Sequence, residues 1–584
     1  MSEPSVDPRP LLPQWLLGLA GVLAFGLLLV ELGFRLSITN QRYVMLATTT
    51  VLWAGVLAEI GIIIHQPRRL AYLKTHVGPC IVTLLLLVAL AGKAQIVPWL
   101  QSRATDLTFI RVESIFLGAL QAVLLGRLAH RALRINQLLA FSKISPRVLL
   151  IGSFVGLILV GAGLLMMPRA TVESAHLSWL DALFTSTSAV CVTGLIVVDT
   201  ATVFTPFGQS VLMVLFQLGG LGLMTFAYFF ITAFSGVTLK DRALLSDLLN
   251  EEDFGKITSS LGAIFVLTLS FEAIGAILLH ASIAPEQANW FKSIFHAISA
   301  FCNAGFSVYS LGLADENTVN NYAYQSVIMG LIICGGLGFP VLNNLWERAL
   351  WVRHDRLRRP PRLTTHSKVV LVATGALIVV GTLLIHGFEF GRSEPGAYTP
   401  TLWNALFNAV TARTAGFNTL PMESLAPAAA IMMIGLMFVG AGPASTGGGI
   451  KVTTFAISLL NTLRILRRPG DDLVAFGRRI PDELAHRAFA IVLLAMLWVG
   501  LTTLCLAALM PDRNALDLAF EAVSAFATVG LSRGLTPALP DMGKIIIILS
   551  MLVGRIGILY AALGVAGRAS RGRIGYPTAS IIIS

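Results

Sequence analysis

Long apolar runs separated by short polar loops follow one another along almost the whole chain. A run of about 20 apolar residues is long enough for a helix to cross the hydrocarbon core of a membrane. The pattern predicts spanning helices at 13–36, 44–65, 78–99, 107–130, 146–168, 206–236, 258–283, 324–347, 367–388, 427–463, 485–510 and 542–567. We therefore expect an all-α polytopic membrane protein, with four spans in a first group and eight in a second.

The composition supports this class. The 584 residues are 55% hydrophobic and only 12% charged, whereas soluble domains carry about 25% charged residues. The net charge of +11 would suit a nucleic-acid partner. However, the basic residues lie in loops beside the spans, which is typical of membrane topology. We expect a lipid bilayer around the chain and no nucleic acid.

Lysine and arginine gather in alternate loops. The basic segments are 240–256, 348–368, 464–487 and 568–573, while the loops between them hold isolated residues such as Arg169 and Lys292. Positive residues favour the cytoplasmic side of a membrane. We therefore predict a multi-pass protein of the cell inner membrane, with the basic loops and the N-terminus in the cytoplasm.

The first four spans carry several charges at membrane depth. Glu31, Lys93 and Glu113 are expected at a similar height, and charges buried in a bilayer usually pair with one another. The sequence thus predicts a four-helix bundle with internal ion pairs. The arginines that begin at Arg127 close its fourth span; a voltage sensor would spread them through the span, so we interpret them as its cytoplasmic end. The role of the bundle stays open.

One short stretch occurs four times in the second group of spans. It reads TSTSAVCVTGL at 185–195 and recurs as FHAISAFCNAGF at 295–306, FNAVTARTAGF at 407–417 and FEAVSAFATVGL at 520–531. Its glycines lie about 110 residues apart, and regular self-similarity indicates internal duplication. Each stretch lies between two spans. The repeating unit is therefore a span, a short pore helix, a glycine-bearing loop and a second span.

Four such loops can surround one axis and offer backbone carbonyls in place of the hydration shell of a small cation. Glycine suits the turning point because it adopts positive φ freely, and the negative ends of the pore helices favour a cation. The predicted ion-binding filter is Val192, Thr193, Gly194, Asn303, Ala304, Gly305, Thr414, Ala415, Gly416, Thr528, Val529 and Gly530. These residues alone predict a monovalent cation, selected at the external side. Plain glycine turns with no ion would explain one such stretch better than four in register.

The third inner span is interrupted by GAGPASTGGGIK at 440–451. One proline and five glycines cannot sustain a helix, and unwound backbone at membrane depth needs partners or water. The predicted gate is Gly440, Ala441, Gly442, Pro443, Ala444, Ser445, Thr446, Gly447, Gly448, Gly449 and Lys451. A simple kink, the alternative, would need only one proline or glycine. Lys451 either places its charge near the ion path or snorkels to the cytoplasm.

Four charged residues beside these stretches are further candidates. Arg555 lies deep in the last inner span and needs a partner or a wet cavity. Asp199 follows the first filter loop and either concentrates cations at the pore mouth or caps a turn. Arg413 is expected to brace the third filter loop, and Glu272 is interpreted as structural. The glycine-rich stretch at 440–451 lacks the G-x-x-x-x-G-K-[ST] pattern and no strand precedes it, so we expect no cofactor and no enzyme activity.

The motifs SAVCVTGL, SAFCNAGF, TARTAGFNT and SAFATVGLSRGLT resemble those of the TrkH/KtrB family of potassium-uptake membrane subunits, which is itself similar to plant and fungal potassium transporters. The resemblance covers the chain from about residue 146 onward. It implies potassium as the transported ion, since a glycine stands in all four filters. It also implies an intramembrane loop beneath the filter, a pore-facing Arg555, a homodimer, and a cytoplasmic nucleotide-binding ring like TrkA or KtrA as partner. The acidic residue that often follows this arginine in the family is absent here.

The sequence thus predicts a bundle at 1–140 and four pseudo-symmetric pore repeats at 141–250, 251–360, 361–480 (with the gating stretch) and 481–584. The expected function is potassium uptake through a carbonyl filter, gated at the unwound third inner span. Two alternatives remain: a sodium- or proton-coupled potassium or sodium symporter on the same scaffold, and a non-conducting membrane sensor with the bundle as receptor.

Overall fold

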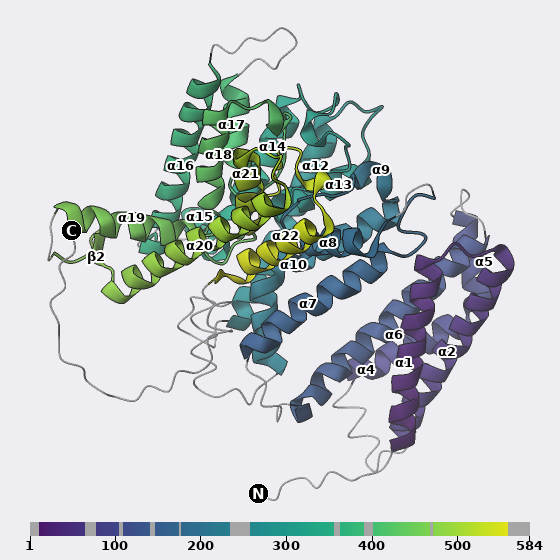
Figure 1. Cartoon of the computed structure of the whole chain (residues 1–584). Coiled ribbons are helices and arrows are strands. Elements are labelled where there is room, and N and C mark those ends of the chain that lie inside the picture. The colour runs from purple at the N-terminus through teal and green to yellow at the C-terminus, as the bar shows by residue number, and fades with distance from the viewer. Residues whose placement is uncertain are drawn as a thin grey trace, which may run out of the picture.

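A computed structural model describes residues 11–64, 77–103, 109–139, 146–173, 177–233, 257–354, 362–390, 401–467 and 471–558. Helices account for nearly all of its regular secondary structure (Figure 1). The strands of the described part, β1 (Val474–Ala475) and β2 (Arg478–Arg479), form one short antiparallel hairpin. Its turn uses Phe476 and Gly477, both at positive φ.

The N-terminal bundle lies to one side of the remaining helices (Figure 1). It contains α1 (Leu11–Gly33), α2 (Ile38–Ile64), α4 (Val77–Ala91), α5 (Lys93–Arg103) and α6 (Phe109–Leu139). The predicted internal ion pair is present, because Lys93 Nζ lies 2.6 Å from Glu113 Oε1. The third predicted span, 78–99, is wrong as a continuous helix: α4 and α5 meet at 78° around Gly92. The break falls at a glycine, the residue with the fewest backbone restrictions. Lys93, the residue that follows it, contacts both Glu113 and the Thr49 hydroxyl.

The end of α1 is one place where the bundle is attached to the rest of the chain. The amide of Arg169 donates to the Gly33 carbonyl at 2.9 Å, and its guanidinium donates to the Glu31 carbonyl at 3.2 Å. Arg35 pairs with Glu173 and donates to the Thr171 carbonyl at 3.0 Å. The end of α1 is therefore held against the segment that follows the first helix of the second group.

The second group consists of four successive units, each with a similar order of helices. The first has α7 (Pro146–Leu165), α8 (Trp179–Val190), α9 (Thr200–Val203) and α10 (Pro206–Ala233), and the second has α12 (Ile257–Ser282), α13 (Trp290–Phe301), η1 (Gly312–Ala314), α14 (Tyr322–Leu337) and α15 (Phe339–His354). The third has α16 (Thr365–Glu389), α17 (Leu402–Thr411), η2 (Met422–Ser424), α18 (Pro427–Phe438) and α19 (Val452–Arg467), and the fourth has α20 (Asp482–Leu509), α21 (Ala515–Phe526), η3 (Thr536–Ala538) and α22 (Asp541–Ile556). In each unit a short helix follows the filter loop before the inner span begins.

Two inner spans differ from the prediction. The second, expected as one helix over 324–347, bends by 105° between α14 and α15 at Gly338, whose φ is +91°. The amide of Phe339, freed by this break, donates to the Ala444 carbonyl at 3.1 Å. The fourth was expected as one helix over 542–567, but α22 ends at Ile556 and the chain breaks at Gly557, where φ is +96°; Ile558 is helical again. Residues 559–584 lie outside the described part.

The described residues include four helices that are long and apolar enough to cross a membrane, α2, α16 and α20 and the 262–282 part of α12. The bent pairs α4–α5 and α14–α15 pass the same test together, and four shorter apolar helices fall within predicted spans. Large apolar side chains such as Leu383 on α16 and Leu504 on α20 point outward, where only lipid would make their exposure favourable. The buried core lies instead around the four short pore helices.

Candidate functional site

Each pore helix begins with a side-chain cap. Ser178 accepts from the Asp181 amide, Asn289 from Phe291, Thr401 from Asn404 and Asn514 from Leu516, at 2.8–3.3 Å. Such caps satisfy the free amides at a helix N-terminus. The helices α8, α13, α17 and α21 are only 10–12 residues long and end one or two residues short of the filter triplets. Their partially negative C-termini therefore lie next to the filter loops.

The filter loops share one unusual backbone conformation. The first residue of each triplet has a left-handed φ: +57° at Val192, +59° at Asn303, +68° at Thr414 and +51° at Thr528. The four triplet glycines also have positive φ, between +71° and +94°, whereas the middle residues do not. A left-handed backbone costs a side-chain-bearing residue roughly 1–2 kcal/mol. Its occurrence at the same place in all four loops identifies one strained turn used four times.

The middle residue of each triplet is tied back to its own pore helix. The amides of Thr193, Ala304 and Val529 donate to the serine carbonyl five residues earlier, at 2.7–2.9 Å. In the third loop Ala415 donates to the Thr411 carbonyl, four residues earlier, at 3.0 Å. These bonds occupy the amide hydrogens and leave the carbonyl oxygens of the same residues free of the helix.

The four triplet glycines form a closed ring. A Cβ atom built on Gly194 would lie 2.5 Å from the Ala304 carbonyl oxygen, and one on Gly305 would lie 2.8 Å from the Ala415 oxygen. A Cβ on Gly416 would overlap the carbonyl oxygen of Val529. The ring is completed because a Cβ on Gly530 would overlap the carbonyl oxygen of Thr193, back in the first loop. The predicted filter residues are therefore brought together about one axis, in the order of the repeats.

The inner helices pack on the pore helices through matching glycines. Gly219 of α10 lies against the Val190 carbonyl, Gly335 of α14 against that of Phe301, and Gly554 of α22 against that of Phe526, with no room for a Cβ at any of them. Each carbonyl belongs to the last residue of a pore helix. The third repeat has no such contact among the described residues, because α18 ends at Phe438 and residues 440–451 follow it.

Residues 440–451, the intramembrane loop, lie against two of the filter loops. A Cβ on Gly447 would overlap the Thr414 hydroxyl, and one on Gly448 would overlap that of Thr528. The two ends of the loop pair with each other, since the Gly440 amide donates to the Ile450 carbonyl at 2.8 Å. The predicted gate residues thus form a folded-back loop beside the first residues of the third and fourth triplets.

Three cationic side chains hold carbonyl groups of this loop. Arg413 donates to Gly440 at 3.4 Å, Lys451 donates to Gly447 at 2.6 Å, and Arg555 donates to Thr446. Arg555 also donates to the Gly219 carbonyl and so connects the loop to the first inner helix. Within the described ranges no carboxylate forms a salt bridge with any of the three. The loop is therefore surrounded by positive charge that backbone oxygens alone stabilise.

The loop is further fixed to the second repeat. The Thr446 hydroxyl donates to the Phe301 carbonyl at 3.1 Å, and the Gly442 amide donates to the Gly336 carbonyl at 2.8 Å. Gly336 lies two residues before the break at Gly338, and the Phe301 carbonyl lies against Gly335. Hydrogen bonds therefore join the intramembrane loop of the third repeat to the segment around the bend in the second inner span.

Two buried polar residues, each of which lies behind a different filter loop, were not identified from the sequence. His296 on α13 and Glu521 on α21 both stand nine residues before a triplet glycine. His296 Nε2 lies 2.9 Å from the Ser307 hydroxyl, and Glu521 accepts from the Ser532 hydroxyl at 2.7 Å. The same spacing in two copies of the repeat could have indicated these contacts, which hold the chain just outside the filter.

Two side-chain contacts between repeats, one ion pair and one hydrogen bond to a backbone carbonyl, were also missed. Lys544 on α22 pairs with Asp181 on α8 at 2.6 Å. Arg533, in the fourth loop, pairs with Asp517 at 2.7 Å and donates to the Met422 carbonyl of the third repeat at the same distance. No local signal identifies partners so far apart in the sequence.

Asp199 and Glu272 have structural partners. Asp199 caps α9, because its carboxylate accepts from the Ala201 amide at 3.1 Å and the Thr202 hydroxyl at 2.9 Å. This geometry favours the capping interpretation of Asp199. Glu272 accepts from the Gln217 amide group at 3.1 Å, which joins the second outer helix to the first inner helix.

The described geometry is that of a membrane protein with four re-entrant loops around one axis. Residues 148–569 match the family TrkH, described as a cation transport protein. The chain is 39% identical to the Ktr system potassium uptake protein B of Bacillus subtilis over 447 residues, which is 75% of this chain and 96% of that relative. It is 38% identical to the protein of the same name from Vibrio alginolyticus (75% of this chain, 94% of the relative). It is 35% identical to the potassium/sodium uptake protein NtpJ of Enterococcus hirae (76% and 98%).

A solved structure has the same fold. The potassium transporter TrkH from Vibrio parahaemolyticus matches 82% of this chain and 97% of its own with a TM-score of 0.58, at 18% sequence identity. This chain belongs to the TrkH family of cation transport proteins. It is an integral membrane protein of a family of transporters and not of enzymes, as the sequence predicted. The family match begins at residue 148 and leaves the N-terminal bundle outside it.

Proposed function

We propose that this protein takes up potassium ions through the ring of filter carbonyls. The single observation that carries the proposal is the closed contact of Gly194, Gly305, Gly416 and Gly530 with the carbonyl oxygens of the neighbouring repeats. A ring of carbonyl oxygens can replace the water around a dehydrated cation. The names of the relatives from Bacillus subtilis and Vibrio alginolyticus support potassium as that cation. The ion is the substrate, and no cofactor is proposed.

Ion flow would be inward and driven by the membrane potential. We place the filter at the external side of the cell inner membrane and the N-terminus in the cytoplasm, because the basic loops lie on the other side of the spans. One elementary charge that crosses the membrane gains about 2.3 kcal/mol per 100 mV. A downhill pathway therefore needs no coupled ion.

The intramembrane loop would act as the gate. It lies against Thr414 and Thr528, the first residues of two filter triplets, so an ion that leaves the filter on this side meets the loop. Arg555 and Lys451 add positive charge at the same place. A cation would pass only when the loop moves and the bonds to Thr446 and Gly447 open. Arg555 thus supplies pore electrostatics, whereas Asp199 is proposed as a cap alone.

The assembly proposed for this chain follows the family resemblance. It comprises a homodimer of pore subunits and a cytoplasmic nucleotide-binding ring. The basic segment 348–368 is the part of the chain whose charge suits such a contact; residues 355–361 lie outside the described part. Copurification of the chain with a ring protein, followed by measurement of the mass of the complex, tests both points.

A sodium-linked activity is the second candidate. It is favoured by the similarity to NtpJ, which is named a potassium/sodium uptake protein. On the same scaffold, a symporter would bind potassium and sodium together, and its potassium uptake would depend on a sodium or proton gradient.

Uptake of rubidium into proteoliposomes at a fixed potential separates these candidates. We expect uptake that potassium inhibits strongly and sodium weakly, and that persists without any sodium or pH gradient. Uptake that needs one of these gradients identifies the symporter. Absence of uptake at every potential, with the protein correctly inserted, refutes the proposal and favours a membrane sensor.

A further inference from the structure

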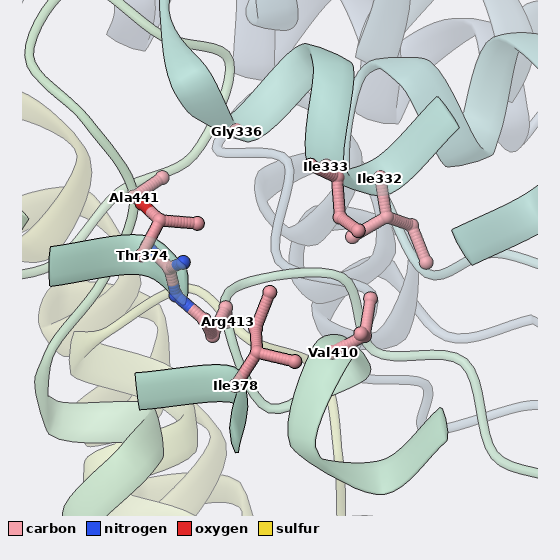
Figure 2. A pocket seen from close by; sticks show the side chains of 8 residues that line it. All are labelled: Ile332, Ile333, Gly336, Thr374, Ile378, Val410, Arg413 and Ala441. Atoms are coloured by element: carbon pink, nitrogen blue, oxygen red, sulfur yellow. The ribbon is translucent and has the colours of Figure 1, made fainter. Parts of the chain in front are cut away.

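A small pocket lies behind the third filter loop. It is lined by residues of α14, α16, α17 and the two loops that follow α17 and α18: Ile332, Ile333, Gly336, Thr374, Ile378, Val410, Arg413 and Ala441 (Figure 2). Apart from Arg413 and Thr374, these residues have no polar side chain. The pocket has room for about one species of the size of a water molecule.

Arg413 brings a charge into this apolar setting. Its side chain is only 6% exposed, and its guanidinium nitrogens lie near Thr374 and Ala441 (Figure 2). One nitrogen, Nη2, donates to the Gly440 carbonyl at the long distance of 3.4 Å, while the buried Nε has no hydrogen-bond partner. Within the described ranges, no carboxylate pairs with this guanidinium. A buried charge of this kind is costly unless a counter-charge accompanies it.

Thr374 supplies a second donor without a partner. Its hydroxyl lies in the middle of α16, is buried, and makes no hydrogen bond. Both unpartnered groups of the pocket, Arg413 Nε and Thr374 Oγ1, can donate a hydrogen bond. The pocket therefore offers two donors, one of them charged, to a single small acceptor.

A water molecule fits these donors less well than an anion does. A water that accepts from Arg413 Nε could give one hydrogen to the oxygen of Thr374, because a hydroxyl also accepts. Its second hydrogen would then face the side chains of Ile332, Ile378 and Val410, which accept nothing, and the Thr374 proton would still lack an acceptor. An unsatisfied buried polar group costs about 1–3 kcal/mol. An anion only accepts, and its negative charge also compensates that of Arg413. The size of the pocket restricts the choice to a monatomic or similarly small inorganic ion.

We propose that this pocket is a binding site for one chloride-like inorganic anion, held by Arg413 Nε and the Thr374 hydroxyl. The inference rests on the side chains of the pocket and does not depend on the proposed transport activity. Because Arg413 belongs to the third filter loop and contacts Gly440 of the intramembrane loop, the bound anion would neutralise a positive charge directly behind both.

The first test locates the ion. Purified protein is crystallised with potassium bromide in place of potassium chloride, and the anomalous signal of bromide is measured. We expect a peak within hydrogen-bond distance of Arg413 Nε and Thr374 Oγ1. A water molecule without anomalous signal at this place, or an empty pocket, overturns the proposal.

The second test measures stabilisation by the anion in solution. The melting temperature is compared in potassium gluconate, chloride and bromide at equal potassium concentration, since a ligand that binds only the folded state raises it. We expect chloride and bromide to raise the melting temperature of the native protein. This increase should be lost in Arg413→Gln and reduced in Thr374→Val, which keeps the side-chain volume.

The control is Arg478→Gln, on the exposed strand β2, which should keep the full response. If Arg413→Gln does not fold, the halide response of Thr374→Val alone tests the site. An equal halide response in Thr374→Val, Arg478→Gln and the native protein contradicts the site. Because neither test uses ion flux, a failed anion site and a failed transport proposal give different results.

Discussion

Replacement of Gly194 by serine tests the filter ring most directly. The residue has φ +86°, a backbone that costs a residue with a Cβ roughly 1–2 kcal/mol. The added Cβ would lie 2.5 Å from the Ala304 oxygen and 3.0 Å from Gly305 Cα, so the oxygen must retreat to beyond 3.0 Å. The second filter loop would then present a displaced carbonyl to the ion.

This displacement predicts a loss of ion selectivity. If the displaced carbonyl weakens potassium binding by about 1.4 kcal/mol relative to sodium binding, the preference for potassium over sodium falls about tenfold. The ratio is measured as the concentrations of potassium and of sodium that halve rubidium uptake into proteoliposomes at fixed potential. The control is Gly163→Ser on α7, where no atom lies within 4 Å of the added Cβ. An unchanged ratio in a folded and active Gly194→Ser protein would falsify the assignment of these glycines to an ion filter.

Other substitutions examine the gate and the support of the filter. Deletion of residues 441–448 should raise rubidium uptake severalfold, because the loop ends already pair through Gly440 and Ile450; flux that stays at the native level places the gate elsewhere. Arg555→Gln removes the charged donor to Thr446 and should also raise uptake; equal or lower uptake in a stable variant contradicts the proposal that Arg555 helps to close the gate. Glu521→Gln puts an amide group among hydroxyl donors at a fully buried site, which should cost about 1–3 kcal/mol of stability. Its melting temperature should therefore fall clearly, whereas the exposed Glu316→Gln should leave it unchanged.

The positions of most helices could be predicted from the sequence because they depend on local pattern. A long apolar run must lie in lipid or in a core whatever its neighbours do. The caps at Ser178, Asn289, Thr401 and Asn514 likewise act on amides two or three residues away. The four glycines of the ring were found for a different reason: repetition at nearly constant spacing is visible in the sequence.

The helix breaks were harder to predict. The stretch around Gly338 contains several glycines, and each of them could have carried the bend. Gly338 carries it because the carbonyl of Ala444, from a different span, accepts the amide of the residue that follows. At Gly92, Lys93 is drawn to Glu113 and Thr49 on two other helices. A break that depends on a partner in another span leaves no signal in its own segment.

The sequence by itself determined the class of protein and the four glycine-bearing loops, since these follow from hydrophobic runs and from a motif copied four times. Only the tertiary structure decided that the glycines meet in a closed ring, that Arg555 joins the intramembrane loop to the first inner helix, and that Arg413 and Thr374 share a pocket. The physical reason is that such contacts join residues tens to hundreds of positions apart. They form only when whole helices pack, and the satisfaction of buried carbonyls and charges then selects the partners.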